Sequence, residues 1–143
     1  MFASADFLFL PTELDAIATK TGAFAQKVMV VLLESDLQKA RPFLEKMMGA
    51  AKLNLDQDAL LIQFNSLQRA NIAAEIKNKA PEQVLVFGIP PEMLCLNIEA
   101  KKYQPLFFLN TQWVFADNLA TLEPDKNLKT ALWTAMQVVF KLK

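Results

Sequence analysis

Residues Lys27 to Glu34 read Lys-Val-Met-Val-Val-Leu-Leu-Glu, an unbroken apolar run with a charged residue at each end. A strand that is covered on both faces has such a run, because neither face meets water. Two later segments, Ala59 to Phe64 and Val84 to Phe87, have the same character. These three runs predict buried strands of a largely parallel sheet.

Two shorter strand candidates follow, Leu106 to Leu109 and Gln112 to Phe115. They are separated by Asn110-Thr111, and a hairpin and a single bent strand are both compatible with this spacing. The aromatic residues of this region are expected to belong to the core rather than to a base-stacking platform. They are Phe107, Phe108, Trp113 and Phe115.

Helical patterns lie between the apolar runs. Apolar residues recur at three- and four-residue steps from Phe43 to Ala51, and Pro42 suits the first turn of that helix. A second pattern covers Gln68 to Lys79, with Glu75 on its exposed side, and a final helix is expected from about Asp125 to Leu142. Alternating strands and helices predict a layered α/β domain.

The 143 residues are 53% hydrophobic, enough for one domain with a substantial core. Residues 27–143 are expected to form this core. Residues 1–26 are less regular, and an N-terminal helix over Thr12 to Ala18 and a separate arm are the two alternatives. Met1 to Leu10 is apolar but interrupted by Asp6, and no apolar run reaches the about 20 residues that span a bilayer. We therefore expect a cytoplasmic protein without a membrane segment.

Composition argues against most catalytic chemistry. The chain has no histidine, which removes the commonest general base and metal ligand. Cys95 is the single cysteine and is expected to be a small buried apolar residue. The 15 basic and 15 acidic residues balance, so strong direct binding to nucleic acid is not expected. No cofactor or metal is expected, and an enzyme is the less favoured class.

Ligands of open α/β sheets bind beyond the carboxyl ends of the strands. Glu34 and Asp36 follow the first buried run, and Gly88 and Pro90 follow the third. The two acids suit a general base or a hard cation, although Asp36 equally suits a cap or a turn. We treat these four residues as a candidate strand-end cleft.

Trp133, Met136 and Phe140 lie to one side of the inner stripe of the final helix. A helix with two apolar faces either packs between layers or presents one face to a partner. Because tryptophan is frequent at binding hot spots, these three residues are candidate partner-binding residues.

Three segments together resemble the psi subunit of bacterial DNA polymerase III. They are Val84-Leu-Val-Phe-Gly-Ile-Pro90, the stretch from Phe115 to Trp133 that ends in Ala-Leu-Trp, and the stretch from Phe43 to Ile62. The likeness covers about residues 27–140. It implies a three-layer α/β/α fold with a mostly parallel central sheet, similar to uracil-DNA glycosylases but without their activity.

The resemblance also implies a role. The psi family bridges the clamp loader to the chi subunit, which contacts single-stranded-DNA-binding protein, and its N-terminal arm engages the clamp loader. By analogy, the apolar residues of the N-terminal arm would form a docking peptide. They are Phe2, Phe7, Leu8, Phe9 and Leu10.

Three functions are compatible with these observations. The first is a non-catalytic subunit that binds protein partners, among them clamp-loader or polymerase subunits. The second is an enzyme of the same layered fold that acts on a nucleotide or nucleobase through Glu34, Asp36 or the Gly88 loop. The third is a structural domain that self-associates through the face from Trp133 to Phe140.

Overall fold

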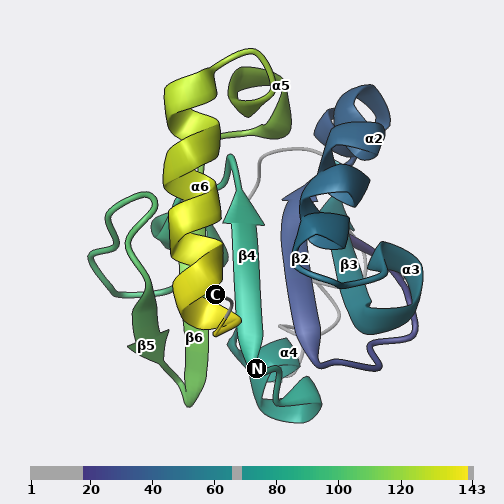
Figure 1. The fold of residues 1–143 in the computed structure, drawn as a ribbon. Coiled ribbons are helices and arrows are strands. Elements are labelled where there is room, and N and C mark those ends of the chain that lie inside the picture. The colour runs from purple at the N-terminus through teal and green to yellow at the C-terminus, as the bar shows by residue number, and fades with distance from the viewer. Residues whose placement is uncertain (1–17, 66–68, 142–143) are drawn as a thin grey trace, which may run out of the picture.

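Six strands form one sheet in the order β1-β3-β2-β4-β6-β5 (Figure 1). The computed structural model describes residues 18–65 and 69–141. The strands are β1 (Ala18–Thr21), β2 (Val28–Leu33), β3 (Ala59–Phe64), β4 (Gln83–Phe87), β5 (Leu106–Phe108) and β6 (Thr111–Ala116). The helices are α2 (Glu34–Ala50), α3 (Leu55–Asp58), α4 (Ala73–Lys79), the 3-10 helix η2 (Pro91–Leu94), α5 (Leu119–Leu122) and α6 (Lys126–Val139).

The centre of the sheet confirms the three predicted buried strands. β3, β2, β4 and β6 are neighbours and run parallel. Each is covered on both faces, which explains the continuous apolar runs. The predicted α/β class is therefore correct.

The sheet as a whole is mixed, and the prediction of a mostly parallel sheet is corrected at both edges. β5 runs antiparallel to β6, and β1 runs antiparallel to β3. Only Leu109 and Asn110 connect β5 to β6, both with positive φ (54° and 59°). Such a two-residue link closes a hairpin, whereas parallel strands need a long crossover. The hairpin alternative is thus confirmed.

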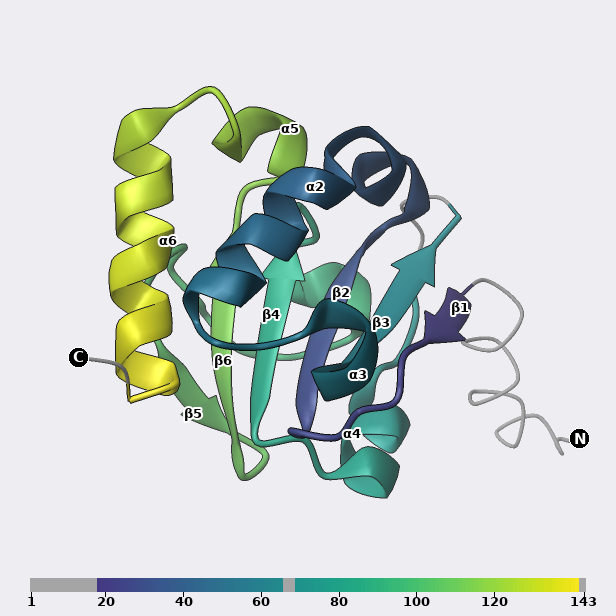
Figure 2. The same ribbon diagram turned by 45° about the vertical axis from the view of Figure 1, so that its right-hand side comes forward.

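β1 has no counterpart in the sequence-based prediction. It lies at the edge beyond β3, as Figure 2 shows. Its residues, Ala-Thr-Lys-Thr, form a short and mostly exposed strand, so the sequence has no apolar run that would predict it. The predicted arm of residues 1–26 is therefore wrong over Ala18–Thr21, which belong to the sheet. The predicted helix from Thr12 to Ala18 lies outside the described residues except for Ala18, which is in β1.

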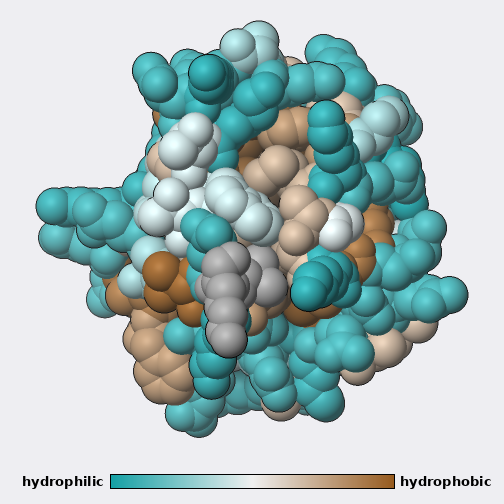
Figure 3. Space-filling model, in the orientation of Figure 1, coloured by the Kyte–Doolittle hydropathy of each residue, from teal (hydrophilic) through white to brown (hydrophobic). Residues whose placement is uncertain are grey.

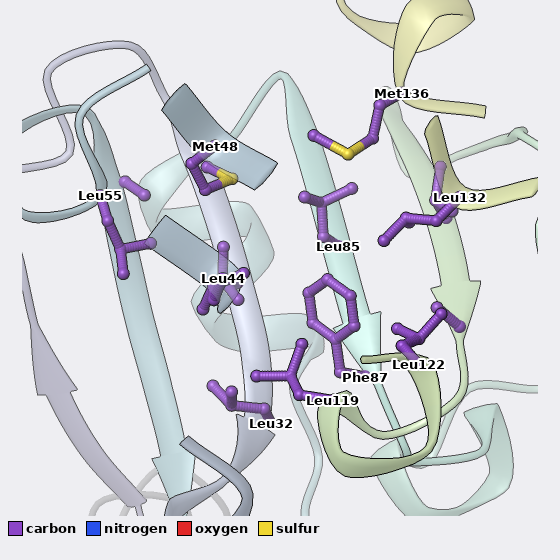
Figure 4. Close-up of a cluster of buried hydrophobic side chains, with 14 of the residues drawn as sticks. Leu32, Leu44, Met48, Leu55, Leu85, Phe87, Leu119, Leu122, Leu132 and Met136 are labelled. Atoms are coloured by element: carbon purple, nitrogen blue, oxygen red, sulfur yellow. The ribbon is translucent and has the colours of Figure 1, made fainter. Parts of the chain in front are cut away.

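Helices lie on both faces of the sheet. α2, α5 and α6 cover one face, where a first core is centred on β2 and β4 (Figure 4). Leu85 and Phe87 of β4 meet Leu119 of α5 and Leu132 of α6 there. α4, η2 and the following coil cover the other face, where Trp113 is fully buried.

Three helices differ in extent from the prediction, and the helix expected from Gln68 to Lys79 begins only at Ala73, as α4. α2 begins at Glu34, directly after β2, and its backbone leaves helical geometry at Ala40 (φ −132°). Pro42 follows this break and so lies in the first turn of a new helical segment, as expected. α6 begins after Asp125, whose side chain accepts a hydrogen bond from the N–H of Leu128.

Three side chains differ in burial from the prediction. Glu75 is buried, because its Oε1 pairs with the Nζ of Lys20 on the unpredicted strand β1, 3.1 Å away. Phe107 is 69% exposed, because it lies on an edge strand. Cys95 is exposed in a left-handed position (φ 59°) that ends η2. Within residues 18–65 and 69–141, no helix is both long and apolar enough to cross a bilayer.

Candidate functional site

The carboxyl ends of β2 and β4 lie side by side, and the chain leaves them toward opposite faces of the sheet, into α2 and η2. Open α/β sheets commonly bind ligands at such a divergence. Asp36 is only 5% exposed here. Its Oδ2 accepts the N–H of Leu119 at 2.7 Å, and its Oδ1 accepts the N–H of Ala120 at 3.1 Å. Asp36 therefore holds the first turn of α5, whose own N-cap residue is Asn118.

Glu34 is half-buried at the start of α2. Neither Glu34 nor Asp36 lines the pocket that is formed at the neighbouring strand ends. The four predicted residues thus do not line one pocket. Asp36 holds the start of α5, a contact that the sequence-based prediction did not include, and it makes no side-chain cap at the start of its own helix.

Gly88 and Pro90 line a pocket of about 510 Å³ at the carboxyl ends of β4 and β6. Gly88 has φ +75°, and its N–H donates to the carbonyl of Ala116 at 2.9 Å. A Cβ at this position would lie 2.8 Å from the Cβ of Asn118. Glycine is therefore required here both by the backbone conformation and by the close approach.

The sequence-based prediction missed the polar groups that flank this pocket. The Nζ of Lys102 lies 2.6 Å from Asp117 Oδ1, and the Tyr103 hydroxyl donates to Asp117 Oδ2 at 2.5 Å. The same hydroxyl accepts the N–H of Asp117 at 3.1 Å. Asp117 directly follows β6, and this position after a strand could have identified it in the sequence.

The three groups shift one another's protonation. Hydrogen bonds from Lys102 and Tyr103 lower the pKa of Asp117. Burial, together with the hydrogen bond to Asp117, raises the pKa of Tyr103 to about 12. At neutral pH the cluster is an ionised carboxylate held by an ammonium and a neutral phenol. Both oxygens of Asp117 are occupied, so this carboxylate is poorly suited to accept a proton from a substrate.

Glu92 is the other carboxylate that lines the pocket, and its residue is exposed. Over the part of the chain that the structure describes, no three His, Cys, Asp or Glu residues come together as a metal site would require. The pocket consequently offers the Lys102–Asp117 ion pair, one exposed carboxylate, the Asn118 side chain and backbone groups.

A second candidate surface lies between α2 and α6. Trp133 is half-buried and lines an open hollow of about 310 Å³ between these helices. Figure 3 shows pale to tan surface between α6 and α2, with hydrophilic side chains around it. The other lining residues are Met47, Ala50, Lys126, Lys129 and Thr130.

The predicted partner-binding residues of α6 do not share one surface. Met136 is 1% exposed and belongs to the core, so it is unavailable to a partner. Phe140 is half-buried and lines a separate hollow beside Val28 and Gln83. The predicted docking residues of the N-terminal arm lie outside the described residues. They are Phe2, Phe7, Leu8, Phe9 and Leu10.

No protein-family model matches this chain, and a comparison with curated proteins finds no match either. A functional assignment therefore depends on the geometry of the two surfaces and on the resemblance in the sequence.

Proposed function

We propose that this chain is a non-catalytic subunit that binds other proteins, with a role similar to that of the psi subunit of bacterial DNA polymerase III. Its partners would be clamp-loader or polymerase subunits, and its fold would be of the uracil-DNA glycosylase type without the activity. One observation carries the proposal: two acids at the strand ends, Asp36 and Asp117, are engaged within the fold, while the hollow beside Trp133 is open to a partner.

The strand-end acids support a structural role. A general base needs an oxygen that can reach the proton it removes. Asp36 uses both oxygens to hold α5, and Asp117 uses both to hold Lys102 and Tyr103. Histidine, which commonly serves beside an extruded base in base-excising enzymes, is absent from the sequence.

The hollow beside Trp133 supports protein binding. Its walls are mainly apolar, and it lies between the ends of two helices rather than inside the core. Lys126 and Lys129 contribute positive charge to its lining. An apolar side chain flanked by acidic residues is the partner chemistry that matches this surface, because an aromatic anchor and complementary charge favour specific binding.

Affinity capture tests the proposal. Tagged protein is expressed in its host cells and recovered together with its partners, which are identified by mass spectrometry. Clamp-loader or polymerase subunits are expected at a level well above that of a tag-only control. If these subunits are not enriched over the control, the proposed role is wrong.

A second candidate function is an enzyme that acts on a nucleotide or nucleobase. The pocket at Gly88 favours it, because two carboxylates, Glu92 and Asp117, line that pocket. The test is incubation with nucleotides and with uracil-containing single-stranded DNA, followed by product analysis. Turnover that is lost in Glu92→Gln would favour this candidate over the binding subunit, and the first proposal predicts no turnover.

A further inference from the structure

β5 forms one edge of the sheet, and none of the other described strands pairs with its outer side. Phe107 lies opposite Gln112 in the β5–β6 register. The N–H of Gln112 donates to the carbonyl of Glu82 at 3.0 Å, on the side away from β5. Phe107 and Gln112 are therefore a non-hydrogen-bonded pair, and the N–H and C=O of Phe107 point outward from the sheet.

The side chain of Phe107 also faces solvent. Leu106 and Phe108 pack against the core on the side of α4 and η2, so Phe107 lies on the opposite face, the one that α6 covers. It is 69% exposed. An exposed aromatic residue and unpaired backbone groups thus coincide at one residue.

Val138 of α6 extends this apolar surface and is 57% exposed. It follows Trp133 by five residues, which is about 140° around a helix. Because Trp133 lies toward α2, Val138 lies on the opposite flank of α6, toward β6 and β5. Figure 3 agrees, with hydrophobic surface over β5 and the C-terminal part of α6.

The two edges of the sheet differ in charge. Edge strands of soluble proteins usually carry a charged residue, often lysine, that opposes pairing with another chain. β1 has such a residue, Lys20, which pairs with Glu75. The segment from Tyr103 to Ala116, which contains β5, has no Asp, Glu, Lys or Arg. β5 therefore lacks the protection that β1 has.

We infer that β5 pairs with β5 of a second copy of this chain, antiparallel, about a twofold axis at Phe107. In this arrangement the two Phe107 residues exchange two backbone hydrogen bonds, and the Phe107 and Val138 surfaces of both copies become covered. A second copy suits this edge because the twofold axis places identical uncharged residues opposite each other without repulsion. An edge without charged side chains offers no salt bridge to a charged partner, so charge favours no other occupant.

Sedimentation velocity of the full chain over a wide concentration range tests this inference. The wild type is expected to shift from monomer to dimer as concentration rises. Phe107→Lys should raise the dissociation constant at least about tenfold, because it introduces repulsion and removes a buried aromatic group. Thr19→Lys is the matched control, an exposed position on the opposite edge strand, and should leave the dissociation constant unchanged.

Two further measurements make the result independent of the folding of Phe107→Lys. Val138→Lys changes an exposed helix position and should weaken the dimer in the same way, whereas Trp133→Ala, on the other flank of α6, should not. Hydrogen exchange of the wild-type Phe107 amide should slow as concentration rises. A wild type that stays monomeric throughout overturns the inference, as does a dimer that survives both lysine substitutions or that Trp133→Ala alone disrupts.

Discussion

Replacement of Asp36 by alanine tests how the strand-end acids are used. The substitution removes both acceptors that hold the start of α5 and leaves the N–H of Leu119 without a partner in a residue that is 0% exposed. An unsatisfied buried N–H costs about 1–3 kcal/mol, whereas the N–H of the exposed Ala120 can bond to water and the N-cap residue of α5, Asn118, stays in place. We expect Asp36→Ala to lower the free energy of unfolding by about 1–3 kcal/mol.

Urea unfolding, followed by tryptophan fluorescence, measures this effect. Asp36→Asn keeps one acceptor oxygen but loses the charge, so its free energy of unfolding should fall between those of the wild type and Asp36→Ala. Ser35→Ala, at the exposed neighbouring position, is the control and should be within about 0.5 kcal/mol of the wild type. If Asp36→Ala lowers the free energy of unfolding by less than about 0.5 kcal/mol, the role of Asp36 in holding α5 is refuted. Asp36 would then again be a candidate catalytic residue.

Two further predictions concern the pocket at the ends of β4 and β6. Gly88→Ala should destabilise the protein by at least about 1 kcal/mol in urea unfolding, because alanine is strained at φ +75° and its Cβ meets Asn118; an unchanged midpoint would contradict the crowding. The Asp117 contribution to stability should be present above about pH 4 and lost as pH falls through its lowered pKa, whereas the Tyr103 contribution should be present below about pH 10 and lost as pH rises toward about 12. Thermal melts across pH should show that Tyr103→Phe lacks the fall in stability that the wild type shows above about pH 10. The same alkaline fall in both proteins would contradict the role given to Tyr103.

The centre of the fold was predictable because burial leaves a local signal. β2 is covered on both faces, so Val28 to Leu33 is apolar without interruption, and no long-range information is needed to recognise it. The short hairpin from β5 to β6 was equally local. β1 left no such signal, because a short edge strand in contact with water has no apolar pattern to read.

The site was less predictable because its contacts span the sequence. Asp36 meets Leu119 across a separation of 83 residues, and only this contact decides between a structural role and a base. Asp117 acquires its role from Lys102 and Tyr103, which lie in a coil without a motif. The aromatic composition of the β5 region predicted that Phe107 belongs to the core. Only the strand order shows that Phe107 lies on an edge strand and is exposed.

We propose that the chain binds clamp-loader or polymerase subunits through the hollow beside Trp133. The most direct measurement is biolayer interferometry of the purified chain with purified clamp-loader and polymerase subunits, using Lys126→Glu/Lys129→Glu as the test variant. Lys39→Glu/Lys46→Glu, at exposed positions of α2, is the control with the same change in charge. We expect the wild type to bind, the test variant to bind at least about tenfold more weakly, and the control to bind as the wild type does. Absence of wild-type binding to every subunit, or equal binding by both variants, would contradict it.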